Sequence, residues 1–155
     1  MSLPGRSPEG WHELAEHVAE ILDVGPGARV FDVDCGSGEF LEPFYLNGYR
    51  VGGTDPEPSM IEMARAAMPD GMFTVGEASK LDPAAPWDVV ICRSLAGALD
   101  VDEMRGLVSR MFAKATHAIA FLHVPDERHQ PLLRALAEAG ARAVQIEASN
   151  VFARV

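Results

Sequence analysis

The sequence contains few cysteines and little positive charge. Its two cysteines, Cys35 and Cys92, are too few for a disulfide framework and lack the spacing of metal ligands. We therefore expect two reduced thiols and no metal site. The 13 lysines and arginines are outnumbered by 23 aspartates and glutamates, which gives a formal net charge of −10. This charge disfavours a nucleic-acid partner, because proteins that bind a phosphate backbone usually carry a basic face.

Long apolar runs are also absent. No stretch approaches the ~20 residues that a membrane-spanning helix needs, and residues 1–6 lack the apolar region and cleavage site of a signal peptide. These absences predict a soluble, cytoplasmic protein without a membrane partner. The 155 residues, 48% of them hydrophobic, match one globular domain. We expect a single domain over 1–155, with an N-terminal helical segment over 1–27 and a core over 28–155.

Helical and strand patterns alternate along the core. Apolar residues three or four positions apart predict helices over about 11–22, 39–47, 59–68 and 104–112, and a further helix marked by Leu132, Leu133 and Leu136 and closed by Gly140. Short apolar or β-branched runs predict strands over 30–33, 50–54, 72–75, 87–92 and 118–123. Asp100 or Asp102 is the expected N-cap of the fourth helix.

This alternation predicts an α/β protein with a doubly wound, Rossmann-like parallel sheet covered by helices on both faces, an α/β/α sandwich. The end of the chain differs, because two β runs, 142–147 and 151–155, flank the turn residues Ser149 and Asn150. Two such runs predict a terminal antiparallel β-hairpin.

Ligands of such sheets bind beyond the carboxyl ends of the strands, so the residues at these positions are the candidates for a site. A glycine-rich turn with Gly36 and Gly38 follows the first strand, and Asp55 follows the second. Glycines let the backbone approach a ligand, the next helix N-terminus favours an anion, and a carboxylate accepts hydrogen bonds from ribose hydroxyls. Each signal alone is also compatible with a tight turn or a helix cap, but together they indicate a nucleoside site.

Four segments carry a resemblance to a known family. Residues 30–38, Val-Phe-Asp-Val-Asp-Cys-Gly-Ser-Gly, resemble the first motif of the class I S-adenosylmethionine (SAM)-dependent methyltransferases, an acidic residue, any residue, then Gly-x-Gly-x-Gly. Residues 51–60, 76–78 and 87–92 are similar to their second, third and fourth motifs. The resemblance covers nearly the whole chain. It implies the strand order 3-2-1-4-5-7-6, SAM as the cofactor and methyl transfer to a small-molecule acceptor.

The resemblance also implies roles at the methionine and ribose end of the cofactor. Asp32 and the turn through Gly36 and Gly38 would hold the methionine portion. Asp55 would bind the ribose diol, and Arg93, just after the fourth strand, would flank the sulfonium.

Other matched residues would surround the adenine. Pro56 and Met60 would line its pocket, Glu77 would accept from the adenine amino group, and the Ala78 backbone N–H would reach a ring nitrogen. For catalysis, the candidate base is His123 at the end of the fifth strand, because an imidazole with an ordinary pKa near 6.5 suits proton abstraction near neutrality. A purely structural role for this histidine remains open.

Asp34 departs from the family pattern, since it stands where the first glycine of the motif is expected. Its charge would either compete with the carboxylate of the cofactor for the helix N-terminus or turn toward the ammonium group of the cofactor and help to hold it. We predict a weaker cofactor affinity than is typical of the family.

Two alternatives remain beside the enzyme, a nicotinamide-dinucleotide oxidoreductase and a non-catalytic domain, whereas a P-loop protein is excluded. A nicotinamide-dinucleotide oxidoreductase needs a third glycine where Leu41 stands, and a P-loop needs a Gly-Lys-Ser/Thr that is missing after the first strand. A non-catalytic cofactor-binding or degenerate methyltransferase-like domain stays open because of Asp34 and the short chain. The cleft would be either open to solvent or closed by residues 1–10, by a second subunit in a homodimer, or by the substrate.

Overall fold

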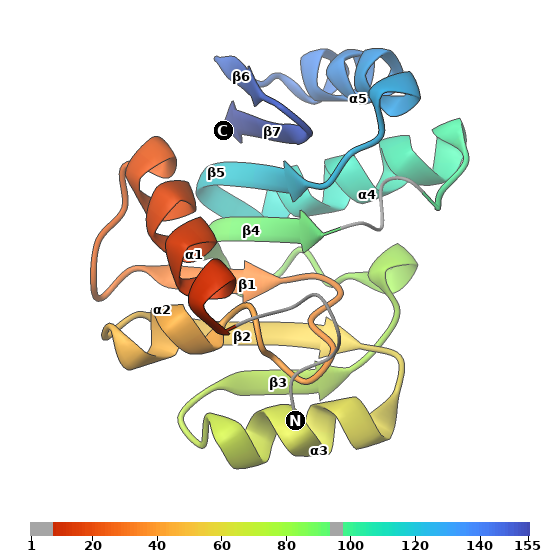
Figure 1. Cartoon of the computed structure of the whole chain (residues 1–155). Coiled ribbons are helices and arrows are strands. Elements are labelled where there is room, and N and C mark those ends of the chain that lie inside the picture. The colour runs from red at the N-terminus through yellow and green to blue at the C-terminus, as the bar shows by residue number, and fades with distance from the viewer. Residues whose placement is uncertain (1–7, 94–97) are drawn as a thin grey trace.

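The computed structural model describes residues 8–93 and 98–155 and shows a seven-stranded sheet in the order β3-β2-β1-β4-β5-β7-β6 (Figure 1). The strands are β1 (Arg29–Asp32), β2 (Arg50–Asp55), β3 (Met72–Val75), β4 (Trp87–Arg93), β5 (Ala115–Leu122), β6 (Val144–Glu147) and β7 (Asn150–Arg154). Strands β1 to β5 are parallel, and β7 runs antiparallel to both β5 and β6. The predicted fold class and strand order are confirmed.

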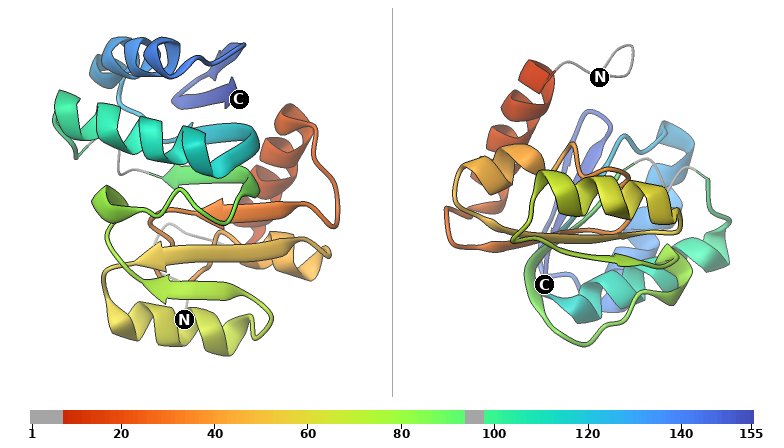
Figure 2. Two further views of the ribbon diagram at one scale, coloured as in Figure 1. Left: turned by 180° about the vertical axis from the view of Figure 1, so that it is seen from behind. Right: turned by 90° about the horizontal axis from the view of Figure 1, so that it is seen from below.

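Helices cover both faces of this sheet (Figure 2). One face carries α1 (Pro8–Leu22), α2 (Glu42–Leu46) and α3 (Pro58–Ala67), and the other carries η1 (Ala78–Lys80), α4 (Val101–Lys114) and α5 (Asp126–Ala139). Each face has its own buried cluster of apolar side chains, so the sheet is the middle of three layers. The β-branched and apolar residues of β4 are buried on both faces, as a central parallel strand requires.

Local signals set several helix ends as predicted. Asp100, one of the two expected caps, begins α4: its side chain accepts from the Glu103 N–H, and the Glu103 side chain accepts in return from the Asp100 N–H. This reciprocal capping box satisfies two of the N–H groups that a helix start leaves open. Gly140 ends α5 in the left-handed conformation, with φ of 94°.

The helix predicted over 39–47 is shorter than expected. It begins at Glu42, because Pro43 has no N–H to donate to the carbonyl of Glu39 and is accommodated only in the first turn. The residues before it form turns, in which the Gly38 carbonyl accepts from the N–H groups of Leu41 and Glu42. A one-turn helix has little dipole, so the predicted anion site at its N-terminus is not supported.

Two other boundaries differ from the prediction. Strand β5 begins at Ala115, three residues earlier than expected, and ends at Leu122, so that His123 follows the strand with φ of 59°. In the hairpin, Glu147 pairs with Asn150, which makes Ala148 and Ser149 the two loop residues. The turn therefore lies one residue before the predicted Ser149–Asn150 pair, because Asn150 already pairs in the ladder.

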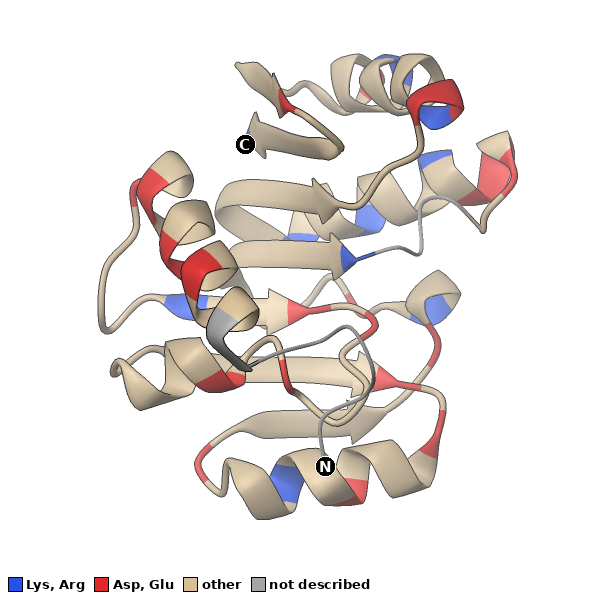
Figure 3. Ribbon diagram, in the orientation of Figure 1, with Lys and Arg blue, Asp and Glu red and all other residues tan. Residues whose placement is uncertain are grey.

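Charged residues are spread along the chain, with acidic positions at the carboxyl ends of β1 and β2 and a basic position at the end of β4 (Figure 3). Within residues 8–93 and 98–155, no helix has the length and apolar character needed to cross a bilayer.

Candidate functional site

The parallel register of the central strands brings three charged residues to one edge of the sheet. Asp32 ends β1, Asp55 ends β2 and Arg93 ends β4. Asp32 is aligned with Gly53 of β2 and with Ile91 of β4, so the ends of these three strands adjoin. Asp32 and Asp55 are 61 and 38 positions from Arg93 in the chain, yet the fold brings the ends of their strands together.

Asp32 and Arg93 form a buried ion pair. The Arg93 Nε donates to Asp32 Oδ2 over 3.1 Å, and the Asp32 side chain has no exposed surface. The guanidinium carbon of Arg93 lies 4.8 Å from the Trp11 ring centroid and 5.1 Å from that of Phe40. Burial raises the pKa of the Asp32 carboxyl, and the nearby guanidinium acts in the opposite direction. The Arg93 guanidinium is thus paired with Asp32. Its position beside the sulfonium of the cofactor stays a prediction.

Asp55 is held by the backbone of the two loops it joins. Its Oδ2 accepts from the Gly36 N–H over 3.0 Å, and its Oδ1 accepts from the Glu57 N–H over 2.9 Å. Gly36 has φ of 56°, a conformation in which side chains are strained. These bonds fix the carboxylate at the carboxyl end of β2, 7% exposed, with the geometry of a fixed hydrogen-bond acceptor.

Gly38 serves the packing of α3. Its φ is 81°, and a Cβ at this position would lie 2.4 Å from Cε of Met68 and 3.4 Å from Cβ of Ala64. Its N–H donates to the Cys35 carbonyl over 2.9 Å. The structure therefore explains this glycine by close packing, and its predicted contact with the methionine portion stays a prediction.

Asp34 is half-buried and lies between the two other aspartates. Its N–H donates to Asp32 Oδ1 over 3.4 Å, and its carboxyl is hydrogen-bonded to that of Asp55. Burial, this hydrogen bond and the neighbouring charges of Asp55 and Asp32 raise the pKa of Asp34 to about 6, against the opposing effect of Arg93. The side chain that replaces the expected glycine is therefore turned toward the carboxylate predicted to bind ribose.

A cavity of about 360 Å³ opens beside Asp34. It brings together four of the predicted residues with part of η1 and one face of α4; the lining residues are Asp34, Pro56, Glu77, Ala78, Ser79, Leu99, Glu103, Gly106, Leu107 and Arg110. Met60, predicted to line the adenine pocket, is not among them: it lies in the first turn of α3 and is 37% exposed.

Sequence reasoning missed the contribution of α4 to this cavity. Glu103, Gly106, Leu107 and Arg110 are spaced three, four and seven positions apart, so they share one helix face. This periodicity was available in the sequence, but which face meets the cavity depends on how α4 packs against the sheet. The aromatic rings around Arg93 were missed for the same reason, since Trp11 and Phe40 come from distant segments.

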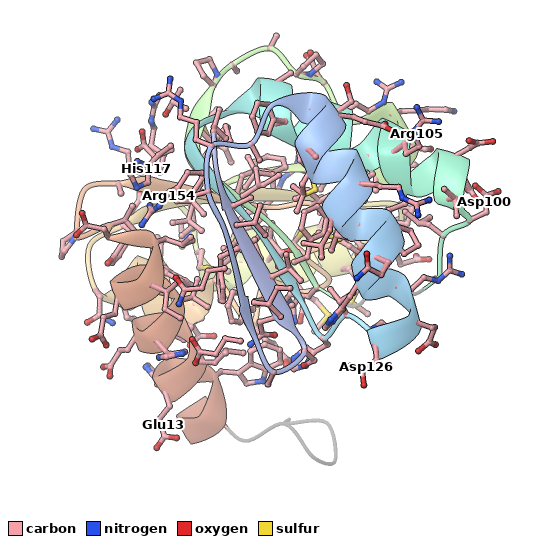
Figure 4. All side chains as sticks on the ribbon, turned by 90° about the horizontal axis from the view of Figure 1, so that it is seen from above. Glu13, Asp100, Arg105, His117, Asp126 and Arg154 are labelled. Carbon is pink, nitrogen blue, oxygen red and sulfur yellow. The ribbon has the colours of Figure 1, made fainter. Side chains whose placement is uncertain are left out.

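Two histidines, His117 and His123, lie toward opposite ends of β5. His123 is exposed just after β5, where its backbone N–H donates to Asn150 Oδ1 over 3.1 Å, and it does not line the cavity. His117 lies near the start of β5, with Nε2 2.7 Å from the Leu22 carbonyl oxygen. Figure 4 shows His117 beside Arg154, on the side of the molecule away from Asp100 and Asp126.

Most of the segment 1–10, one of the candidates for closing the cleft, lies outside the described residues. Cys35 and Cys92 are buried thiols that form no disulfide, and burial raises the pKa of the Cys35 thiol to about 12, so this sulfur is a packing group. Within the part of the chain that the structure describes, no three His, Cys, Asp or Glu side chains are grouped to hold a metal ion.

Strand order and helix placement define a doubly wound α/β domain with three charged residues, Asp32, Asp55 and Arg93, at the carboxyl ends of its central strands. A family model described as "Methyltransferase domain" matches residues 30–117, more than half of the chain. The protein belongs to this methyltransferase-domain family, and the resemblance inferred from the motifs is confirmed.

Individual relatives support the same family. The chain is 30% identical over 105 residues to a dTDP-4-amino-2,3,4,6-tetradeoxy-D-glucose N,N-dimethyltransferase of Saccharopolyspora spinosa, covering 65% of this chain and 42% of that protein. It is 27% identical over 135 residues to a trans-aconitate 2-methyltransferase of Paracidovorax citrulli, covering 85% and 50%. The chain thus spans half or less of the length of these curated relatives.

Solved structures show the same fold. A SAM-bound amino pentose methyltransferase of Micromonospora echinaspora superposes with a TM-score of 0.81 at 20% identity, covering 97% of this chain and 92% of that one. The SAM-bound magnesium protoporphyrin IX methyltransferase of Synechocystis gives a TM-score of 0.76 at 18% identity, with coverages of 94% and 79%.

Proposed function

We propose that the protein is a SAM-dependent methyltransferase that acts on a small-molecule acceptor. The observation that carries this proposal is the placement of Asp55, fixed by the N–H groups of Gly36 and Glu57 beside a cavity lined by Glu77 and Ala78. This arrangement suits an adenosyl group, because Asp55 offers a carboxylate to the ribose diol and the cavity offers polar and apolar side chains to the base. Membership of the methyltransferase-domain family supports the same assignment.

The site residues are proposed in the roles that the motifs imply. Asp55 binds the ribose, and Asp32, Gly36 and Gly38 shape the methionine end, where Arg93 neutralises Asp32. Around the adenine we propose Pro56, Glu77 and Ala78, which line the cavity, and Met60 at its margin. Asp34 lies between the two ends.

When bound, SAM supplies an electrophilic methyl group on a positively charged sulfur. The chain must then align the acceptor, exclude water and take up a proton if the acceptor carries one. We propose His123 for proton uptake, since it follows β5 at the same edge of the sheet as Asp32 and Asp55. Its exposure is compatible with release of that proton to solvent.

The acceptor class is proposed from the relatives. Their names specify N,N-dimethylation of a dTDP-linked amino sugar, O-methylation in ubiquinone biosynthesis, and methylation of trans-aconitate. We further propose one domain over 1–155 with its core at 28–155, and a cytoplasmic location, which is supported by two buried thiols that form no disulfide. We also propose that the N-terminal segment or a second subunit closes the site.

A non-catalytic cofactor-binding domain is the second candidate. It is favoured by Asp34, which places a carboxyl group where the motif has glycine. It is also favoured by the ion pair with Arg93, which already occupies the Asp32 carboxylate. Calorimetry with SAM, followed by mass spectrometry of products with pooled small acceptors, separates the two candidates. Binding with turnover supports the enzyme, binding without turnover of any acceptor supports the second candidate, and no binding contradicts both.

A further inference from the structure

Asp34 lies at the junction between the two halves of the proposed cofactor site. Its N–H contacts Asp32, the carboxylate at the methionine end, and its carboxyl contacts Asp55, the carboxylate at the ribose end. It also lines the cavity. In SAM the sulfur is the single atom that joins methionine to ribose. A cofactor that spans the two ends must therefore carry its sulfur past Asp34.

The charge of that sulfur changes during the reaction. It is a cationic sulfonium in SAM and a neutral thioether in S-adenosylhomocysteine (SAH), the product. We propose that Asp34 is a specificity-determining residue that makes the site bind SAM in preference to SAH. This inference rests on the proposed function and deepens it, because such a residue favours release of the product after methyl transfer.

The charges around Asp34 support this role. Asp32 is neutralised by the Arg93 guanidinium 3.1 Å away, whereas Asp55 is compensated by two backbone N–H groups. Within residues 8–93 and 98–155 the Asp34 carboxyl forms no ion pair with a lysine or an arginine, and the side chain it is hydrogen-bonded to is the acidic Asp55. The carboxylates of Asp34 and Asp55 repel each other when both are ionised. The cationic sulfonium of SAM near both would relieve that repulsion, whereas the neutral thioether of SAH would not.

Other charged groups reach the same cavity from its far side. They are Glu77 from the loop after β3, and Glu103 and Arg110 from α4. One arginine opposite two glutamates leaves the lining acidic, so these groups reinforce the preference for a cation. With its pKa raised to about 6, the Asp34 carboxyl is ionised in most molecules at pH 7.5 and protonated in most at pH 5. The preference should therefore weaken on acidification.

The test compares three ligands of nearly equal shape by calorimetry: SAM, SAH and sinefungin, in which a protonated amine replaces the methylsulfonium. We expect the wild-type protein at pH 7.5 to bind SAM and sinefungin about tenfold more tightly than SAH. In Asp34→Asn, which keeps the shape and removes the charge, the ratio should fall to about threefold or less, as it should for the wild type at pH 5. Asp23→Asn is the matched control: it removes one exposed carboxylate at the end of α1, and its φ of 55° suits asparagine.

The outcomes distinguish this inference from the proposed function. If the wild type binds none of the three ligands, the proposed function fails. If it binds them and the SAH-to-SAM ratio of dissociation constants is equal in the wild type and in Asp34→Asn, only the role of Asp34 is overturned. An equal drop of the ratio in Asp23→Asn would also overturn it, since the effect would then come from net charge.

Discussion

Arg93 and Asp32 end adjacent parallel strands and form a buried ion pair 3.1 Å apart, enclosed on the guanidinium side by the rings of Trp11 and Phe40. Asp32 is fully buried and Arg93 nearly so. A buried charge without its partner is far less stable than the pair, so the two residues depend on each other. Through Trp11, the pair also attaches α1 to the edge of the sheet that carries the site.

Removal of the Arg93 charge should therefore destabilise the fold. We expect Arg93→Met to lower the free energy of unfolding by about 3–5 kcal/mol, because it leaves the Asp32 carboxylate buried and uncompensated. Urea denaturation followed by circular dichroism measures this change. The double variant Asp32→Asn/Arg93→Met should recover most of the loss. A double variant as unstable as the sum of the two single variants would show that the pair is not coupled.

Asp55 should be essential for cofactor binding. Asp55→Ala removes the proposed acceptor of the ribose hydroxyls, and we expect the dissociation constant for SAH to rise by about 100-fold in calorimetry. Asp70→Ala serves as the control, since Asp70 accepts a hydrogen bond from the half-buried Tyr45 and does not line the cavity. Unchanged affinity in a folded Asp55→Ala protein would contradict the ribose assignment.

The stability of the protein should depend on Asp34 through pH. Its pKa in the folded protein, about 6, lies above the ordinary value of 3.8, so the folded state binds the proton more tightly than the unfolded state. The contribution of this group to stability is complete below pH 3.8 and is lost as the pH rises toward and through 6.

Asp34→Asn avoids that loss, so we expect it to raise the free energy of unfolding by about 1 kcal/mol at pH 7.5; solvent screening of a half-buried group keeps the gain below the full linkage value. Urea titrations at pH 4 and pH 7.5 measure the difference, which should shrink at the lower pH. A gain of equal size at both pH values would be evidence against the shifted titration.

Gly38 should be needed for the packing of α3. Gly38→Ala places a Cβ 2.4 Å from the flexible end of Met68 in a backbone conformation unfavourable for alanine, and we expect a loss of about 2–4 kcal/mol in thermal or urea denaturation. Gly25→Ala is the matched control, because a Cβ there meets no atom within 4 Å. Equal stability of the two variants would refute the packing role.

His123 should act in proton uptake if it is the base. His123→Asn suits the positive φ of 59° at this position, and we expect kcat to fall by about 100-fold or more because the proton acceptor is removed. His129→Asn is the control, since His129 Nε2 contacts the Val124 carbonyl near the start of α5. A His123→Asn enzyme with wild-type kcat and pH profile would show that this histidine has only a structural role.

Local sequence signals predicted most of the architecture. The apolar run Val89–Ile91 identified β4, Asp100 and Gly140 marked helix ends, and the motifs after β1, β2 and β3 indicated where the site lies. The errors are at boundaries where a specific residue overrides the general pattern. Pro43 shortens α2, and Asn150 joins the hairpin ladder although its type favours a turn.

The sequence by itself determined which residues stand at the strand ends, because periodicity and turn residues act over a few neighbouring positions. Only the tertiary structure decided what those residues contact. The pairing of Asp32 with Arg93 spans 61 positions, Asp34 turns toward Asp55, and one face of α4 completes the cavity. Such contacts depend on how strands and helices pack in three dimensions, and packing between distant segments leaves no local pattern in the chain.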